Sequence, residues 1–163
     1  MSGDCPIGSI LMFGGAKDHL PSGWLYCDGT IVSQHEYQDL FGVVGHSFGD
    51  VAESPEYDPN KQFFLPDLRG RFVRGVDDKS ARDPDLSLRT DMQSEKIPAT
   101  GVGSCQPDQL GEHYHTYTRI KNESSGIVSG NHWSLGSDDT SKSGGKETRP
   151  LNVAVYFIIR ANY

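Results

Sequence analysis

The sequence predicts a small, loop-rich α+β fold with one helix and a few short strands. A chain of 163 residues has room for one domain and at most a small second one. Its 19 Gly and 9 Pro exceed the average share of these residues without reaching the level typical of disorder. Only one segment has helical spacing, whereas the other apolar runs are short and rich in β-branched and aromatic residues.

Two apolar runs near the N-terminus predict short strands. The first covers residues 7–13 and the second residues 24–27. Asp28-Gly29 directly follows the second run and is a common turn pair. We therefore expect the chain to reverse direction after residue 27.

The clearest helix is predicted over residues 34–44. Ser33 and Glu36 have the spacing of a capping box, in which each side chain bonds the backbone of the other residue. Gly45 lies where the residue after a helix often adopts a left-handed conformation. The apolar positions follow helical spacing and predict the buried face, namely Tyr37, Leu40, Phe41 and Val44.

The remaining apolar segments are separated by long polar stretches. Residues 63–65 and 72–73 flank a turn-like segment and predict two short apolar anchors. Residues 151–159 are apolar at nearly every position, as in a strand that is central in a sheet or buried at a subunit interface. The stretches 77–112 and 121–149 show no period, so we expect long loops that pack their apolar residues against other copies of the chain.

The charge balance argues against two classes of partner. The chain holds 15 Lys and Arg against 22 Asp and Glu, which gives a net charge of −7. This sign does not fit a dedicated binder of nucleic acid or of anionic membranes. The sequence has no membrane-length apolar run, and residues 1–15 lack the pattern of a secretory signal. We therefore expect synthesis in the cytoplasm, with no membrane insertion and no nucleic-acid partner.

The three cysteines do not predict a disulfide framework or a zinc ribbon. Cys5, Cys27 and Cys105 are odd in number and form no C-x-x-C pair. We interpret them as free structural thiols.

His113 and His115 are the candidate metal ligands. In an extended chain, residues two apart point to the same face, so both imidazoles reach one side. Two histidines are too few for an ordinary zinc site, and the missing ligands have two possible sources. One is His132 of the same chain. The other is a three-fold axis, where three copies supply six nitrogens to an octahedral iron or zinc ion. Without further ligands, the pair is a solvated strand face.

Two other groups of residues have both a binding and a structural interpretation. Arg69, Arg71 and Arg74 lie close to Asp67 and would suit an anion or sugar-acid site, but at a tight turn we favour local ion pairs and backbone hydrogen bonds. Aromatic rings in the polar stretches could stack on sugar rings, or could pack in a core or an interface. The candidates for receptor binding are Tyr117 and Trp133, with Tyr114 beside them.

No motif predicts an enzyme. The sequence has no G-x-S-x-G, no H-E-x-x-H, no P-loop and no glycine-rich dinucleotide motif. Its many carboxylates have no spacing that selects the pair a glycosidase needs. We therefore expect binding rather than catalysis.

The order of the short motifs closely resembles the phage tail collar domain. This family is known from the short tail fibres of T-even phages and from small tail-fibre-like bacterial proteins. The motifs are P-I-G-S-I at 6–10, P-x-G-W at 21–24, C-D-G at 27–29, F-L-P-D-L-R-G-R-F at 64–72 and R-P-x-N-V at 149–153. The nine-residue motif has mixed chemistry and the expected neighbours on both sides, so chance agreement is improbable.

The resemblance implies an architecture and a metal site. It implies a collar subdomain over 1–76 and an intertwined distal head over 77–163, assembled as a homotrimer of β and loop structure. In this family the H-x-H motifs of three chains meet around one metal ion, which implies His113 and His115 as ligands to one octahedral iron or zinc ion per trimer. Many members of the family have a second histidine pair further along the chain, whereas here that region offers only His132.

The resemblance also implies a function and a location. It implies a tail-fibre protein of a phage or a phage-derived contractile injection system that binds a host-surface receptor, in particular polysaccharide. A tail or baseplate protein would be a further partner, and the protein would be located on the phage tail or an extracellular contractile particle. The alternatives are a structural plug or adaptor that binds no glycan, and an enzyme acting on polysaccharide.

Overall fold

The chain forms two compact units. The computed structural model describes residues 5–50, 57–94, 96–109, 116–123, 132–139 and 150–162. The first unit consists of Met1–Gln106 and Val153–Tyr163, and the second consists of Pro107–Asn152. The sequence predicts a division into 1–76 and 77–163. The structure instead groups residues 77–106 and the C-terminal strand with the N-terminal part of the chain.

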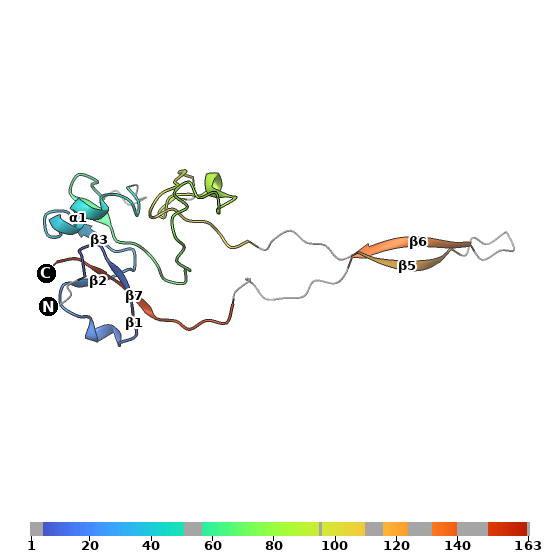
Figure 1. Cartoon of the computed structure of the whole chain (residues 1–163), viewed down its shortest axis with the longest axis horizontal. Coiled ribbons are helices and arrows are strands. Elements are labelled where there is room, and N and C mark those ends of the chain that lie inside the picture. The colour runs from blue at the N-terminus through green and yellow to red at the C-terminus, as the bar shows by residue number, and fades with distance from the viewer. Residues whose placement is uncertain are drawn as a thin grey trace. The chain divides into compact units, whose positions relative to one another are not determined.

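A three-stranded antiparallel sheet joins the two ends of the chain in the first unit (Figure 1). Its strands are β1 (Ile10–Phe13), β2 (Trp24–Tyr26) and β7 (Tyr156–Arg160), in the order β1-β7-β2. The predicted C-terminal strand is therefore central, but it begins at Tyr156 rather than at residue 151. Its position between the two N-terminal strands is the physical reason why it belongs to the first unit.

The helix is shorter than predicted because a turn precedes it. The helix α1 covers Gln38–Val44, and the backbone N–H of Tyr37 donates to the Ser33 carbonyl over 3.1 Å. The Glu36 backbone N–H lies 3.4 Å from Ser33 Oγ, so half of the predicted capping box caps this turn and not the helix. The predicted end is confirmed, since Gly45 has φ 51° and donates its N–H to the Phe41 carbonyl.

A second, two-stranded sheet pairs β3 (Ile31–Ser33) with β4 (Gln62–Phe64). The first unit also contains two short 3₁₀ helices, η1 (Lys17–His19) and η2 (Leu86–Leu88). In the described ranges, the main cluster of buried residues comes from the two sheets, α1 and the neighbouring turns. Its members are Cys27, Leu40, Phe63, Leu65, Ile159 and Ala161. The core thus lies between the helix and the strands.

Polar contacts order the segment after residue 76, which has no apolar period. The Asp83 side chain is buried and accepts a 2.6 Å hydrogen bond from Arg89 Nε. Gln106 Nε2 donates to the other Asp83 oxygen over 3.2 Å, and Arg89 Nη1 donates to the Ser104 carbonyl over 3.0 Å. These contacts hold residues 83–106 together within the first unit.

The second unit contains a β-hairpin where long loops were predicted. Strands β5 (Thr116–Glu123) and β6 (His132–Asp139) pair antiparallel, with Thr116 opposite Asp139 and Glu123 opposite His132. Polar residues outnumber apolar ones along both strands, so neither shows an apolar face along its whole length, by which a half-buried strand is found. The prediction of structureless chain over 121–149 is wrong for the described strand residues.

Several apolar side chains are exposed in the single chain. Phe72 and Val73, expected as anchors, form no strand and are 69% and 63% exposed. Leu151 and Val153, expected in the C-terminal strand, precede β7 and are also exposed.

In the described ranges, no helix has both the length and the apolar character required to cross a bilayer.

Candidate functional site

The two predicted metal ligands lie outside the described residues. His113 and His115 belong to a stretch, 110–115, that the structure does not describe, so their arrangement stays a prediction. Among the residues that are described, no group of three or more His, Cys, Asp or Glu side chains is placed to hold a metal ion.

The two aromatic candidates lie on opposite strands of the hairpin. Tyr117 belongs to β5, is 46% exposed and pairs with Asp138. Trp133 belongs to β6 and pairs with Asn122. The ladder therefore does not place the two aromatic residues opposite each other.

In the first unit, the C-D-G and P-D-L-R-G motifs meet as two interlocked turns. The Leu68 backbone N–H donates to the Cys27 carbonyl over 3.0 Å, and the Gly29 N–H donates to the Pro66 carbonyl over 3.2 Å. Gly29 has φ +77°, and a Cβ at this position would lie 3.1 Å from the Asp67 Cβ. Both the conformation and the close approach explain the glycine of the first motif.

The arginines after this turn are bonded to other residues of the first unit. Arg69 forms a bidentate pair with Asp67, with Nε to Oδ1 at 2.8 Å and Nη2 to Oδ2 at 2.7 Å. This pair lowers the pKa of the Asp67 carboxyl. Arg71 Nη1 lies 3.1 Å from Cys105 Sγ, and Arg74 Nη2 donates to the Arg82 carbonyl over 3.1 Å. The preferred interpretation, local bonding at the turn, is confirmed for Arg69, whereas Arg71 and Arg74 contact residues further along the chain.

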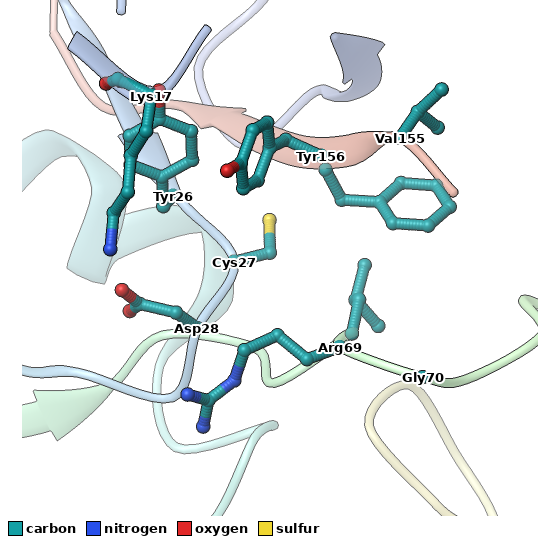
Figure 2. A pocket seen from close by; sticks show the side chains of 10 residues that line it. Lys17, Tyr26, Cys27, Asp28, Arg69, Gly70, Val155 and Tyr156 are labelled. Carbon is teal, nitrogen blue, oxygen red and sulfur yellow. Dashed lines mark hydrogen bonds between the residues drawn. The ribbon is translucent and has the colours of Figure 1, made fainter. Parts of the chain in front are cut away.

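A pocket of about 120 Å³ opens between these turns and β7 (Figure 2). We call it the turn pocket. The charged ends of Lys17, Asp28 and Arg69 lie on one side of the view, and Val155 lies on the other. Its lining comes from η1, β2, both motif turns and the start of β7, namely Lys17, Tyr26, Cys27, Asp28, Leu68, Arg69, Gly70, Val155, Tyr156 and Phe157.

Several lining groups of the turn pocket are held in place by other parts of the unit. The Tyr26 hydroxyl donates a 2.7 Å hydrogen bond to the Lys17 carbonyl, and its ring lies 5.1 Å from that of Tyr156. Asp28 Oδ1 accepts hydrogen bonds from the backbone N–H and the hydroxyl of Thr30. Burial raises the pKa of the Cys27 thiol to about 12, so this part of the lining is an uncharged thiol at neutral pH.

The turn pocket was not predicted from the sequence. Its residues come from positions 17 to 157, and only the fold brings them together. One feature of the sequence could have indicated this site. C-D-G and D-L-R-G each contain a carboxylate and a turn glycine, as two turns that meet around one site would.

Comparisons with known proteins identify the first part of the chain. The family model of the Phage Tail Collar Domain matches residues 8–73, so the chain carries a phage tail collar domain, as its motifs indicated. The matched range contains β1, β2, β3, α1 and β4, together with both interlocked turns.

The similarity to individual proteins extends beyond this domain. The chain is 35% identical to protein RhiB of Rhizobium leguminosarum bv. viciae, over 85% of the chain and 64% of RhiB. It is 28% identical to the uncharacterized protein StfE of Escherichia coli K12, over 86% of the chain and 80% of StfE. It is 31% identical to the short tail fiber protein gp12 of Enterobacteria phage T4, over 68% of the chain and 20% of gp12. The chain thus spans less than two thirds of RhiB and a fifth of gp12.

Proposed function

We propose that this chain is a tail-fibre protein of a phage or a phage-derived contractile injection system, and that it binds polysaccharide on the host surface. The observation that carries this proposal is the collar domain at residues 8–73, in a chain that is also similar to a short tail fibre protein. In this function the protein is located on the tail or on an extracellular particle, where a tail or baseplate protein holds it. Its activity is binding and not catalysis.

A homotrimer is the proposed assembly. Phe72 and Val73 are exposed by more than 60% in the single chain, and Leu151 and Val153 are exposed still further. Monomeric proteins rarely leave large apolar patches in water, so several exposed apolar side chains support an interface between copies. Burial of these side chains between three chains would favour association by removing apolar surface from water.

One transition metal ion, iron or zinc, is the proposed cofactor of this trimer. His113 and His115 of each chain would hold it, giving six imidazole nitrogens in octahedral geometry. A metal bound by three chains stabilises only the associated state, so metal content and assembly should change together.

Native mass spectrometry with elemental analysis of the same sample tests the assembly and the metal. We expect three chains and about one iron or zinc ion per trimer. The double substitution His113→Ala and His115→Ala should remove the metal and lower the melting temperature. A metal-free monomer, or full metal content in the double variant, would contradict the proposed centre.

Binding of the intact protein to purified cell-envelope polysaccharide tests the receptor. Tyr117→Ala and Trp133→Ala should each weaken binding, because aromatic faces pack on sugar rings. Thr118→Ala is the matched control, since Thr118 is also exposed and lies next to Tyr117 on β5. A trimer that binds no polysaccharide would instead be a plug or adaptor, and the release of reducing ends would indicate an enzyme.

A further inference from the structure

We propose that the turn pocket of the collar domain binds one acidic sugar residue, such as a hexuronate. This inference deepens the proposed function and rests on it, because the sugar would be a unit of the receptor polysaccharide. It adds a contact site in the first unit to the aromatic candidates Tyr117 and Trp133 in the second.

The turn pocket is large enough for part of one six-membered ring. Its volume of about 120 Å³ is slightly below the roughly 150 Å³ of an engineered cavity that takes up benzene. A monosaccharide ring can therefore enter in part, with its substituents at the open side. A disaccharide is too large to enter as a whole.

The polar groups of the turn pocket without a hydrogen-bond or ion-pair partner are mostly donors, and one of them, Lys17 Nζ, lies 5.9 Å from the centre of the Tyr26 ring. In the described part of the chain, no carboxylate lies within salt-bridge distance of Lys17 Nζ, and no hydrogen bond involves the Tyr156 hydroxyl or Arg69 Nη1. The matching acceptor is Asp28 Oδ2, since both bonds from Thr30 go to Oδ1. A ligand that satisfies three donors and one acceptor is rich in acceptor oxygens and also carries hydroxyl groups, as a sugar acid does.

Charge favours an acidic sugar over a neutral one. Arg69 is neutralised by its bidentate pair with Asp67, so Asp28 remains as the carboxylate of the lining and Lys17 remains as a cation without a carboxylate partner among the described residues. A ligand carboxylate beside Lys17 would form a charge-assisted hydrogen bond, which is stronger than a bond to a neutral group. A sugar hydroxyl would donate to Asp28.

The opposite side of the turn pocket suits the apolar face of a sugar ring. Val155 contributes an apolar side chain on this side, Leu68 and Phe157 add further apolar lining, and the Cys27 thiol adds no charge. The rings of Tyr26 and Tyr156 lie 5.1 Å apart and are inclined by 59°. This combination of an apolar wall with polar edges is the one that aromatic side chains provide for amphipathic ligands.

Part of the lining is held in place before any ligand binds. Asp67 fixes the guanidinium of Arg69, Thr30 fixes the carboxylate of Asp28, and the Tyr26 hydroxyl is bonded to the backbone of Lys17. Groups that are already positioned lose little conformational entropy on binding, which favours affinity for a small ligand.

Titration of the intact protein with methyl glucuronide tests the proposal, with methyl glucoside as the neutral counterpart. Calorimetry and saturation-transfer NMR report the affinity and the contacting protons. We expect the glucuronide to bind more tightly than the glucoside, and Lys17→Ala to weaken the glucuronide about tenfold while changing the glucoside little. Tyr156→Phe should weaken both, because it removes a hydroxyl and keeps the ring.

Lys61→Ala is the matched control for Lys17→Ala. Lys61 is an exposed lysine paired with Asp58 and does not line the turn pocket, so this variant should bind like the wild type. Lys17 is also exposed, so its truncation should leave the melting temperature unchanged. A wild-type protein that binds neither sugar, or binding that Lys17→Ala leaves unchanged, overturns the proposal.

The experiment separates this inference from the proposed function. If the intact protein binds envelope polysaccharide but neither monosaccharide, the turn pocket is not a sugar site and the proposed function stands. If the glucuronide binds in the pocket and no envelope polysaccharide is bound, the pocket is a sugar-acid site and the proposed receptor is wrong.

Discussion

Asp83 is the side chain that orders the least patterned part of the first unit. It is only 7% exposed, and Arg89 and Gln106 both donate hydrogen bonds to its carboxylate. Arg74 Nη1 lies 3.7 Å from the same group. A charge buried in this way is costly unless it is paired and hydrogen-bonded, so the contacts of Asp83 depend on one another.

Arg89→Ala should destabilise the first unit by about 3–5 kcal/mol, because it leaves the Asp83 carboxylate buried without its closest partner. The free energy of unfolding in urea measures this effect. Arg69→Ala is the control, since its ion pair with Asp67 is 68% exposed on the arginine side, and it should cost at most about 1 kcal/mol. Equal losses in the two variants would contradict the role of burial.

The stability of the first unit should fall in acid. Arg89 lowers the pKa of Asp83 and Arg69 lowers that of Asp67, so both carboxyls are more acidic in the folded state than in the unfolded chain. Their stabilisation is fully present above the unfolded pKa of about 4 and is lost as the pH falls through the folded values. Urea unfolding at pH 7, 5, 4 and 3, as chosen conditions, should show this loss below about pH 4.

Asp83→Asn isolates one of these two contributions. This variant should be less stable at neutral pH and should lose less stability between neutral and acidic pH, because it cannot be protonated. Asp78→Asn is the control, since Asp78 is exposed. An unchanged pH dependence in Asp83→Asn would show that other groups cause the acid sensitivity.

At the scale of helices and strands, the stability of α1 depends on its packing against the core and not on the helix propensity of its residues. A helix of seven residues is too short to be stable alone in water. Leu40 is completely buried and belongs to the main core with Phe63 and Ile159. The apolar spacing seen in the sequence therefore marks the face that stabilises the helix.

Leu40→Ala should destabilise the first unit by about 2–5 kcal/mol, because it leaves a cavity in the core. Val43→Ala is the matched control in the same helix, since Val43 is 61% exposed and should contribute little. Thermal and urea unfolding of both variants measure the difference. A loss in Val43→Ala as large as that in Leu40→Ala would contradict this packing.

Strand prediction succeeded for apolar runs that pair in the first unit and failed for strands that contain no apolar run. Residues 24–27 and the C-terminal run each contain a strand of the first unit. The hairpin of β5 and β6 was missed because its strands show no apolar face. Phe72 and Val73 were expected as anchors because they are apolar, and the single chain gives them no partner strand.

At the scale of the whole molecule, the exposed apolar segment before β7 allows a test of the proposed trimer. Val153→Asp places a charge on an apolar position that the proposed trimer would bury, so it should shift the native mass from three chains toward one. Val43→Asp is the control, because Val43 is also exposed but lies on α1. A Val153→Asp protein that remains fully trimeric would show that this segment lies outside the interface.

Local patterns in the sequence were sufficient for the class of fold, the end of the helix at Gly45, the strand at the C-terminus and the order of the collar motifs. These features depend on residues that are neighbours along the chain, where side-chain spacing and turn chemistry are visible. They also sufficed to favour local pairing of Arg69 with Asp67.

The tertiary structure decided which distant segments meet. It placed β7 between β1 and β2, grouped residues 77–106 with the collar domain, and assembled the turn pocket from positions 17 to 157. No spacing rule reaches across such separations, because these contacts form only when burial of Leu40, Phe63 and Ile159 brings the two ends of the chain to one core.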